Sequence, residues 1–67
     1  MFSIKAARVN AGLSAKEVAT HLGITEDTLY NYERGKSSPN IITALAMAKL
    51  YGRTVEEIDF SMSESSE

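Results

Sequence analysis

The chain has 67 residues, enough for one small domain with a single apolar core. It contains no cysteine, so neither a disulfide nor a thiolate metal site can reinforce the fold. No apolar run approaches the roughly 20 residues needed to cross a bilayer, and the amino terminus lacks a signal-peptide pattern. These features predict a cytoplasmic protein with no membrane partner.

The formal net charge of −2 is distributed unevenly along the chain. Residues 1–54 carry all seven basic side chains and four of the acidic ones, which gives +3. Residues 55–67 carry the other five acidic side chains and no basic one. Because the acidity belongs mainly to the end of the chain, the low isoelectric point is only weak evidence against nucleic-acid binding.

The first two predicted helices begin at capping residues and end at glycines. Ser3 is the expected N-cap of a helix that Gly12 ends. The segment "SAKE", residues 14–17, is a capping-box pattern in which the Ser and Glu side chains satisfy free backbone N–H groups reciprocally. It opens a second helix, which Gly23 stops by adopting the left-handed conformation.

Three further helices are predicted in the rest of the chain. Thr25 caps a third helix that ends near Gly35, and Asn40 caps a fourth that runs to about Tyr51. The segment "TVEE", residues 54–57, is a second capping box and opens a short fifth helix. No strand is expected, so the predicted fold class is all-α with five short helices.

The predicted domain covers residues 1–60, and residues 61–67 form a disordered tail rich in serine and acid. Apolar side chains in the helices recur at spacings of three and four, the period of an amphipathic helix. The inward-facing positions are therefore predicted to be Ile4, Ala7, Val18, Ala19, Leu22, Leu29, Tyr32, Ile41, Ala44, Leu45, Ala48, Tyr51, Val55 and Ile58.

The second and third helices are joined by about three residues, as in a helix-turn-helix. Ala19 lies where two helices that cross steeply need a small side chain. Gly23 supplies the positive φ of the tight turn, and Leu29 anchors the third helix in the same core.

The segment "AGLSAKEVATHLGITEDTLYNYERGKSSPN" resembles the lambda repressor and Cro superfamily, the Xre-type helix-turn-helix regulators. The resemblance implies a lambda repressor-like domain that binds DNA sequence-specifically and regulates transcription, most simply as a repressor. The few catalytic residue types in the chain argue against an enzyme, and no cofactor or small-molecule ligand is expected. The matching positions are Arg8, Gly12, Leu13, Ser14, Glu17, Ala19, Gly23, Ile24, Leu29, Glu33, Gly35, Pro39, Gly52 and Ile58.

In that family the second helix of the motif lies in the major groove and its exposed residues read base edges. By position, the resemblance assigns base contacts to Thr25, Glu26, Asp27, Tyr30 and Asn31. It assigns phosphate contacts to Ser14, Lys16, Arg34, Lys36, Ser37 and Ser38. Ala15 departs from the glutamine common in the family, so one backbone contact is expected to be missing.

Glu26 and Asp27 are the second departure, because relatives commonly carry neutral or basic residues there. Acids in the first turn of a helix are stabilised by the macrodipole, which is one explanation for Asp27. A second explanation is that Glu26 accepts a hydrogen bond from cytosine N4. A third is that this face meets a basic protein partner.

Arg8 and Glu33 occupy positions that commonly pair in the family, and the resemblance implies a structural ion pair rather than a DNA contact. His21 is the only histidine and falls opposite the core side, so it is expected at the surface. No grouping of side chains suggests a metal site or a catalytic residue.

The fourth helix is apolar nearly all round, which favours a homodimer formed through the fourth and fifth helices. The alternative is that the small core wraps this helix more fully. A dimer would read a roughly palindromic operator in double-stranded DNA. A protein-interaction module, antitoxin-like or antirepressor-like, is the rival function on the same scaffold. The predicted dimer contacts are Ile42, Met47, Leu50 and Phe60.

Overall fold

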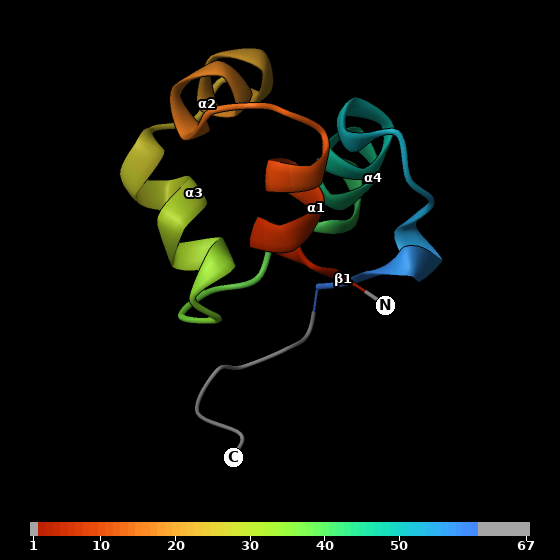
Figure 1. Ribbon diagram of the computed structural model, residues 1–67. Coiled ribbons are helices and arrows are strands. Elements are labelled where there is room, and N and C mark those ends of the chain that lie inside the picture. Colours follow the sequence, from red (N-terminus) through yellow and green to blue (C-terminus); the bar gives the residue numbers. More distant parts are fainter. Residues whose placement is uncertain (1, 61–67) are drawn as a thin grey trace.

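The computed structural model describes residues 2–60, and the predicted tail at 61–67 lies outside them. Four α-helices, one 3-10 turn and two short strands follow one another along the chain (Figure 1). In chain order they are β1 (Phe2–Ser3), α1 (Ile4–Asn10), α2 (Ala15–Leu22), α3 (Glu26–Glu33), α4 (Ile41–Tyr51), η1 (Val55–Glu57) and β2 (Ile58–Asp59).

The four α-helices begin at the capping residues that the sequence predicts. The Ser3 hydroxyl accepts a hydrogen bond from the N–H of Ala6 at 3.0 Å, and the Asn40 side chain accepts one from Thr43 at 2.8 Å. In the capping box of α2, the Ser14 hydroxyl accepts from the N–H of Glu17 at 3.1 Å, and the Glu17 carboxylate accepts from the N–H of Ser14 at 2.8 Å. These contacts satisfy N–H groups that have no partner within their own helix, so they fix where each helix starts.

The prediction of a fifth helix and of no strands is wrong. Residues 55–57 form a single 3-10 turn, stabilised where the Glu57 carboxylate accepts from the N–H of Thr54 at 2.9 Å. Ile58 then adopts an extended conformation with φ −114° and ψ 131°. In this conformation β2 pairs in parallel with β1, with Phe2 opposite Ile58. Burial of Ile58 in the core outweighs continuation of the helix.

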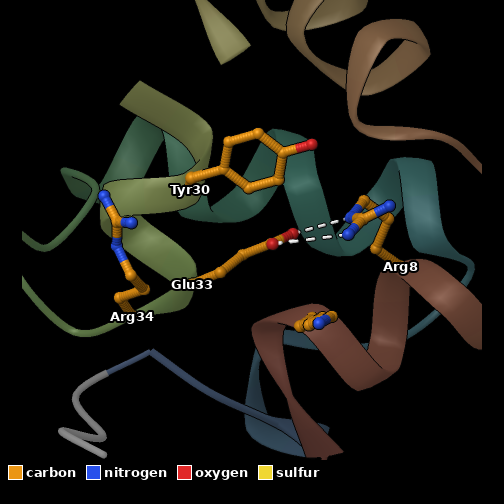
Figure 2. A pocket seen from close by; sticks show the side chains of 5 residues that line it. Arg8, Tyr30, Glu33 and Arg34 are labelled. Atoms are coloured by element: carbon orange, nitrogen blue, oxygen red, sulfur yellow. Dashed lines mark hydrogen bonds and ion pairs between the residues drawn. The ribbon is translucent and has the colours of Figure 1, made fainter. Parts of the chain in front are cut away.

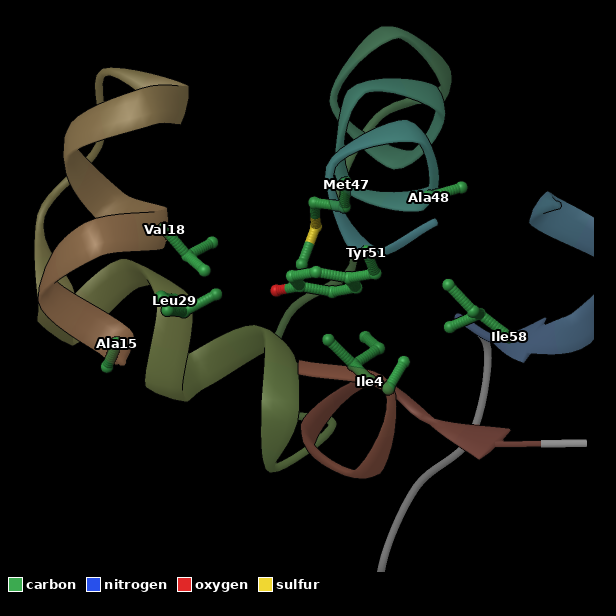
Figure 3. Packing of buried hydrophobic residues seen from close by; sticks show 9 residues of the cluster. Ile4, Ala15, Val18, Leu29, Met47, Ala48, Tyr51 and Ile58 are labelled. Atoms are coloured by element: carbon green, nitrogen blue, oxygen red, sulfur yellow. The ribbon is translucent and has the colours of Figure 1, made fainter. Parts of the chain in front are cut away.

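The core is built from residues of all four α-helices and β2. Leu29, Met47 and Val18 are its largest fully buried side chains. Figure 3 shows Ile4, Val18, Leu29 and Met47 converging around the Tyr51 ring from α1, α2, α3 and α4. Because α3 contributes Leu29 to this cluster, the opposite side of α3 is left facing outward.

The buried face of α4 differs from the predicted one. Ala44, Met47, Ala48 and Tyr51 are buried, at the helical spacing of three and four residues. Ile41 and Leu45, both predicted to face inward, are 67% and 51% exposed. A helix that is apolar on every side gives no periodic signal, so its sequence does not show which face is buried.

The buried face of α4 also overturns one of the four predicted dimer contacts, Met47, and leaves the other three untested. Met47 has no exposed surface and cannot contact a second subunit. Leu50 and Phe60 are half-buried and pack against the core. Ile42 is 76% exposed, and together with Ile41 and Leu45 it forms an exposed apolar face, here called the outer face of α4.

Candidate nucleic-acid interface

The corner between α2 and α3 sets the direction of α3. Gly23 ends α2 with φ 70° and ψ 30°, the left-handed conformation that the sequence predicts. The N–H of Ile24 then donates to the Ala19 carbonyl at 3.0 Å, which closes the turn. Ala19 is buried, and its methyl side chain leaves room for the two helices to pack. The geometry is that of a helix-turn-helix.

Four of the five predicted base-contacting residues are exposed on or next to α3, namely Thr25, Glu26, Asp27 and Tyr30. The Thr25 hydroxyl already accepts from the N–H of Thr28 at 3.1 Å, so it acts as the N-cap of α3. Glu26 and Asp27 lie in the first turn, where the helix dipole favours acids. Within residues 2–60, neither forms an ion pair.

Asn31, in the second half of α3, is half-buried and does not belong to the core. Its amide oxygen accepts a hydrogen bond from Nη2 of Arg34 at 2.8 Å. An arginine can only donate, so this contact identifies the bonded atom as the oxygen and leaves the amide N–H groups available. A polar side chain of α3 with free donors therefore lies beside the cation that caps the end of the helix.

The predicted phosphate contacts lie near both ends of the motif. Lys16 is exposed in the first turn of α2, and Arg34 and residues 36–38 are exposed after α3. Ser14 is exposed too, but its hydroxyl caps α2. The residues of this set that carry positive charge are Lys16, Arg34 and Lys36, and the neutral ones are Ser14, Ser37 and Ser38.

The capping box of α2 also affects a titratable group. The backbone N–H of Ser14 donates to the Glu17 carboxylate, and this bond, together with the Ser14 side chain, lowers the pKa of Glu17. Ala15 stands where the family commonly has a glutamine that contacts the DNA backbone, and the sequence predicted only that this contact is missing. In the structure Ala15 is buried and belongs to the core cluster. The small side chain at this position therefore has a packing role.

Arg8 and Glu33 form a buried ion pair that ties α1 to the end of α3 (Figure 2). Nε of Arg8 lies 2.6 Å from one carboxylate oxygen of Glu33, and Nη2 lies 3.4 Å from the other. Nη1 donates to the Leu13 carbonyl at 3.1 Å. The hydrogen bond to Glu33 raises the pKa of Arg8, while desolvation acts in the opposite direction. The pair thus fixes the position of α3 relative to α1.

A phenol approaches this pair from the core side. Tyr51 is buried, and its hydroxyl has no hydrogen-bond partner within the described part of the chain. Burial raises the pKa of Tyr51, and the negative charge of Glu33 adds to the increase. The hydroxyl therefore stays protonated.

A pocket of about 330 Å³ lies between α1 and the C-terminal half of α3. Figure 2 shows Tyr30 and Glu33 of α3, with Arg34 just after the helix, on one side of the pocket and Arg8 on the other. Lys5 completes the lining and is not among the site residues predicted from the sequence. The signal was present, because Lys5 lies one helical turn before Arg8 and Tyr30 one turn before Glu33.

His21 is exposed, as expected. Residues 2–60 contain no group of three or more histidine, cysteine or acidic side chains that could hold a metal ion. No helix in this part of the chain is both long and apolar enough to span a membrane.

Comparison with known proteins agrees with this geometry. The chain is 38% identical over 60 residues to the cryptic phage CTXphi transcriptional repressor RstR of Vibrio cholerae, covering 87% of this chain and 54% of the relative. It spans about half the length of that repressor. It is 34% identical over 61 residues to an uncharacterized HTH-type transcriptional regulator of Methanothermobacter thermautotrophicus, covering 91% of this chain and 88% of the relative.

No solved structure shows a significant match to the chain. The family described as Helix-turn-helix matches residues 4–58, nearly all of the described domain. The protein belongs to this helix-turn-helix family, of the Xre type that the sequence resembles.

Proposed function

We propose that the protein is a sequence-specific DNA-binding transcriptional regulator that acts as a repressor of the phage repressor or Cro type. The observation that carries the proposal is the outward face of α3, which presents polar side chains while the opposite side is anchored in the core by Leu29. Membership of the helix-turn-helix family and similarity to a phage repressor support it.

In the proposed complex, α3 enters the major groove and Asn31 is its main reader of base edges. The free amide donors of Asn31 suit acceptors such as guanine O6 or N7 and adenine N7. Glu26 or Asp27 can accept from cytosine N4, and Tyr30 can contact a thymine methyl. A carboxylate in this position repels phosphates, so Glu26 and Asp27 would add selectivity rather than affinity.

The remaining polar residues hold the DNA backbone. Lys16 at the start of α2, and Arg34 and Lys36 after α3, are exposed and can contact phosphates on both sides of the groove. Ser14, Ser37 and Ser38 can donate hydroxyl protons to the same backbone. Because such contacts displace counterions, affinity is expected to fall steeply with salt.

The outer face of α4 supports a homodimer on DNA. Ile41, Ile42 and Leu45 expose a contiguous apolar surface that no described residue covers. A two-fold dimer would place two α3 helices about 34–36 Å apart, matching one turn of a roughly palindromic operator. Repression then follows from occlusion of the polymerase.

The test is selection of binding sites from random duplex DNA, followed by mobility shifts of the selected duplex at two salt concentrations. The protein should enrich a defined site and bind it less tightly at the higher salt. Asn31→Ala should lose preference at one base-pair position of each half-site. The matched control is Thr20→Ala, an exposed residue of α2 outside the proposed interface.

A second function has its own observation in its favour. The first turn of α3 exposes two acids without ion-pair partners among residues 2–60, and α4 exposes three aliphatic side chains. This combination suits a protein-interaction module that meets a basic partner. Failure to enrich any site, with no duplex retained at low salt, would favour it over DNA binding.

A further inference from the structure

The pocket between α1 and α3 has an excess of positive charge. Three cations and one carboxylate line its 330 Å³: Lys5, Arg8 and Arg34, with Glu33. The Glu33 charge is already neutralised by Arg8 at 2.6 Å. Lys5 and Arg34 add two positive charges to the lining, and neither forms an ion pair within residues 2–60.

We propose that this pocket binds a phosphate group and that Lys5, which the DNA-reading residues above do not include, is its principal cation. The inference rests on the proposed function, because the phosphate expected there is one of the DNA backbone passing α3. Free phosphate is the other possible source of the same chemistry. Lys5 would extend the phosphate contacts from the helix-turn-helix to α1.

The donors needed to hold a phosphate are present. Arg8 has five N–H groups, and three of them bond Glu33 and the Leu13 carbonyl, which leaves two. Within residues 2–60, Lys5 forms no ion pair, so its three ammonium donors are available. The Tyr30 hydroxyl adds a neutral donor at the pocket wall.

The position in the fold explains why side chains must supply the attraction. The pocket adjoins the C-terminal end of α3, where Arg34 is the C-cap and the helix dipole is negative. An anion there is not stabilised by free backbone N–H groups, so it requires cations. The volume is about ten times the share of one water molecule in the liquid, roughly 30 Å³, and thus admits a hydrated phosphate.

The test compares Lys5→Gln with Lys49→Gln, an exposed lysine of α4 outside the pocket. Both variants and the parent are titrated with the selected duplex over a range of salt concentrations. Loss of one phosphate contact makes the slope of log affinity against log salt less negative by about 0.9. The affinity gap between Lys5→Gln and the parent should therefore narrow about 3.5-fold from 50 to 200 mM salt. Lys49→Gln should keep the parent's slope.

Titration of the free protein with inorganic phosphate, followed by NMR, provides a second measurement. Amide shifts at Lys5, Tyr30 and Arg34 that disappear in Lys5→Gln would support the pocket even if the parent retained no DNA. In that case the proposed function fails while the phosphate site stands, with free phosphate as its source. A parental salt slope in Lys5→Gln, together with no phosphate-dependent shift at these residues, would overturn the inference.

Discussion

The Arg8–Glu33 pair offers the sharpest test of how the recognition surface is held. The perturbation is Glu33→Gln, which keeps the shape and one acceptor oxygen but removes the negative charge. The two side chains are only 10% and 4% exposed, so the Arg8 charge would remain buried without its partner. At 2.6 Å and an effective dielectric constant of about 20, the lost attraction is of the order of 6 kcal/mol.

Much of that attraction is offset in the native protein by the desolvation of both charges, so the measured effect is smaller. Removing one partner of a buried pair costs about 3–5 kcal/mol, and the retained acceptor places Glu33→Gln near 3 kcal/mol. A domain of 67 residues has a free energy of unfolding of about 3–10 kcal/mol. The melting temperature should therefore fall by roughly 12–24 °C.

The assay is urea unfolding of the parent and the variant, with Glu57→Gln as the matched control. Glu57 pairs with Arg53 at 3.9 Å, but the two side chains are 48% and 35% exposed. An exposed pair of this kind contributes less than about 1 kcal/mol. If Glu33→Gln costs no more than Glu57→Gln, the reasoning that the buried pair fixes α3 against α1 is refuted.

Three further predictions concern the corner, the cap and the outer face of α4. Gly23→Ala should lower the free energy of unfolding in urea by about 1 kcal/mol, because the φ of 70° strains a residue with a side chain. Steric clash adds nothing, since an added Cβ meets no atom within 4 Å. An unchanged free energy of unfolding would contradict the left-handed corner. The lowered pKa of Glu17 predicts stability that is complete above the ordinary glutamate pKa of about 4.3 and is lost as the pH falls through the folded value. In Glu17→Gln the loss of unfolding free energy that protonation of Glu17 causes at low pH should disappear. If the variant's unfolding free energy depends on pH as the parent's does, the capping interaction of Glu17 is contradicted. Ile42→Lys, at a residue 76% exposed, should yield a monomer in analytical ultracentrifugation when the parent is a dimer. A parent that stays monomeric on DNA excludes the dimer.

Local chemistry made the helix boundaries and the corner predictable. Ser3, Ser14, Thr25 and Asn40 begin helices because their side chains bond nearby N–H groups, a contact that depends only on neighbours in sequence. The role of Gly23 was predictable because the left-handed conformation that ends a helix is also a local preference of glycine. The Arg8–Glu33 contact spans 25 positions in sequence and was predicted from the family resemblance, not from local rules.

Features that depend on tertiary packing were missed. Strands of two residues, β1 and β2, are too short to show an alternating pattern. The buried face of α4 was assigned incorrectly because apolar residues surround the helix. Packing against the other three helices buries Met47 and leaves Leu45 exposed, and the sequence of α4 alone does not show this. The shared face of Lys5 and Arg8 on α1 could be inferred from their spacing, but the pocket could not, because Tyr30 and Glu33 reach it only through the packing of α3.

The central claim is that α3 presents the surface that meets DNA. The most direct measurement is NMR titration of the protein with its selected duplex, with every backbone amide followed. The account predicts the largest shifts at residues 26–31 and at Lys16 and Lys36, with smaller ones along the buried side of α4. Shifts confined to the outer face of α4, or no bound duplex at low salt, would contradict it.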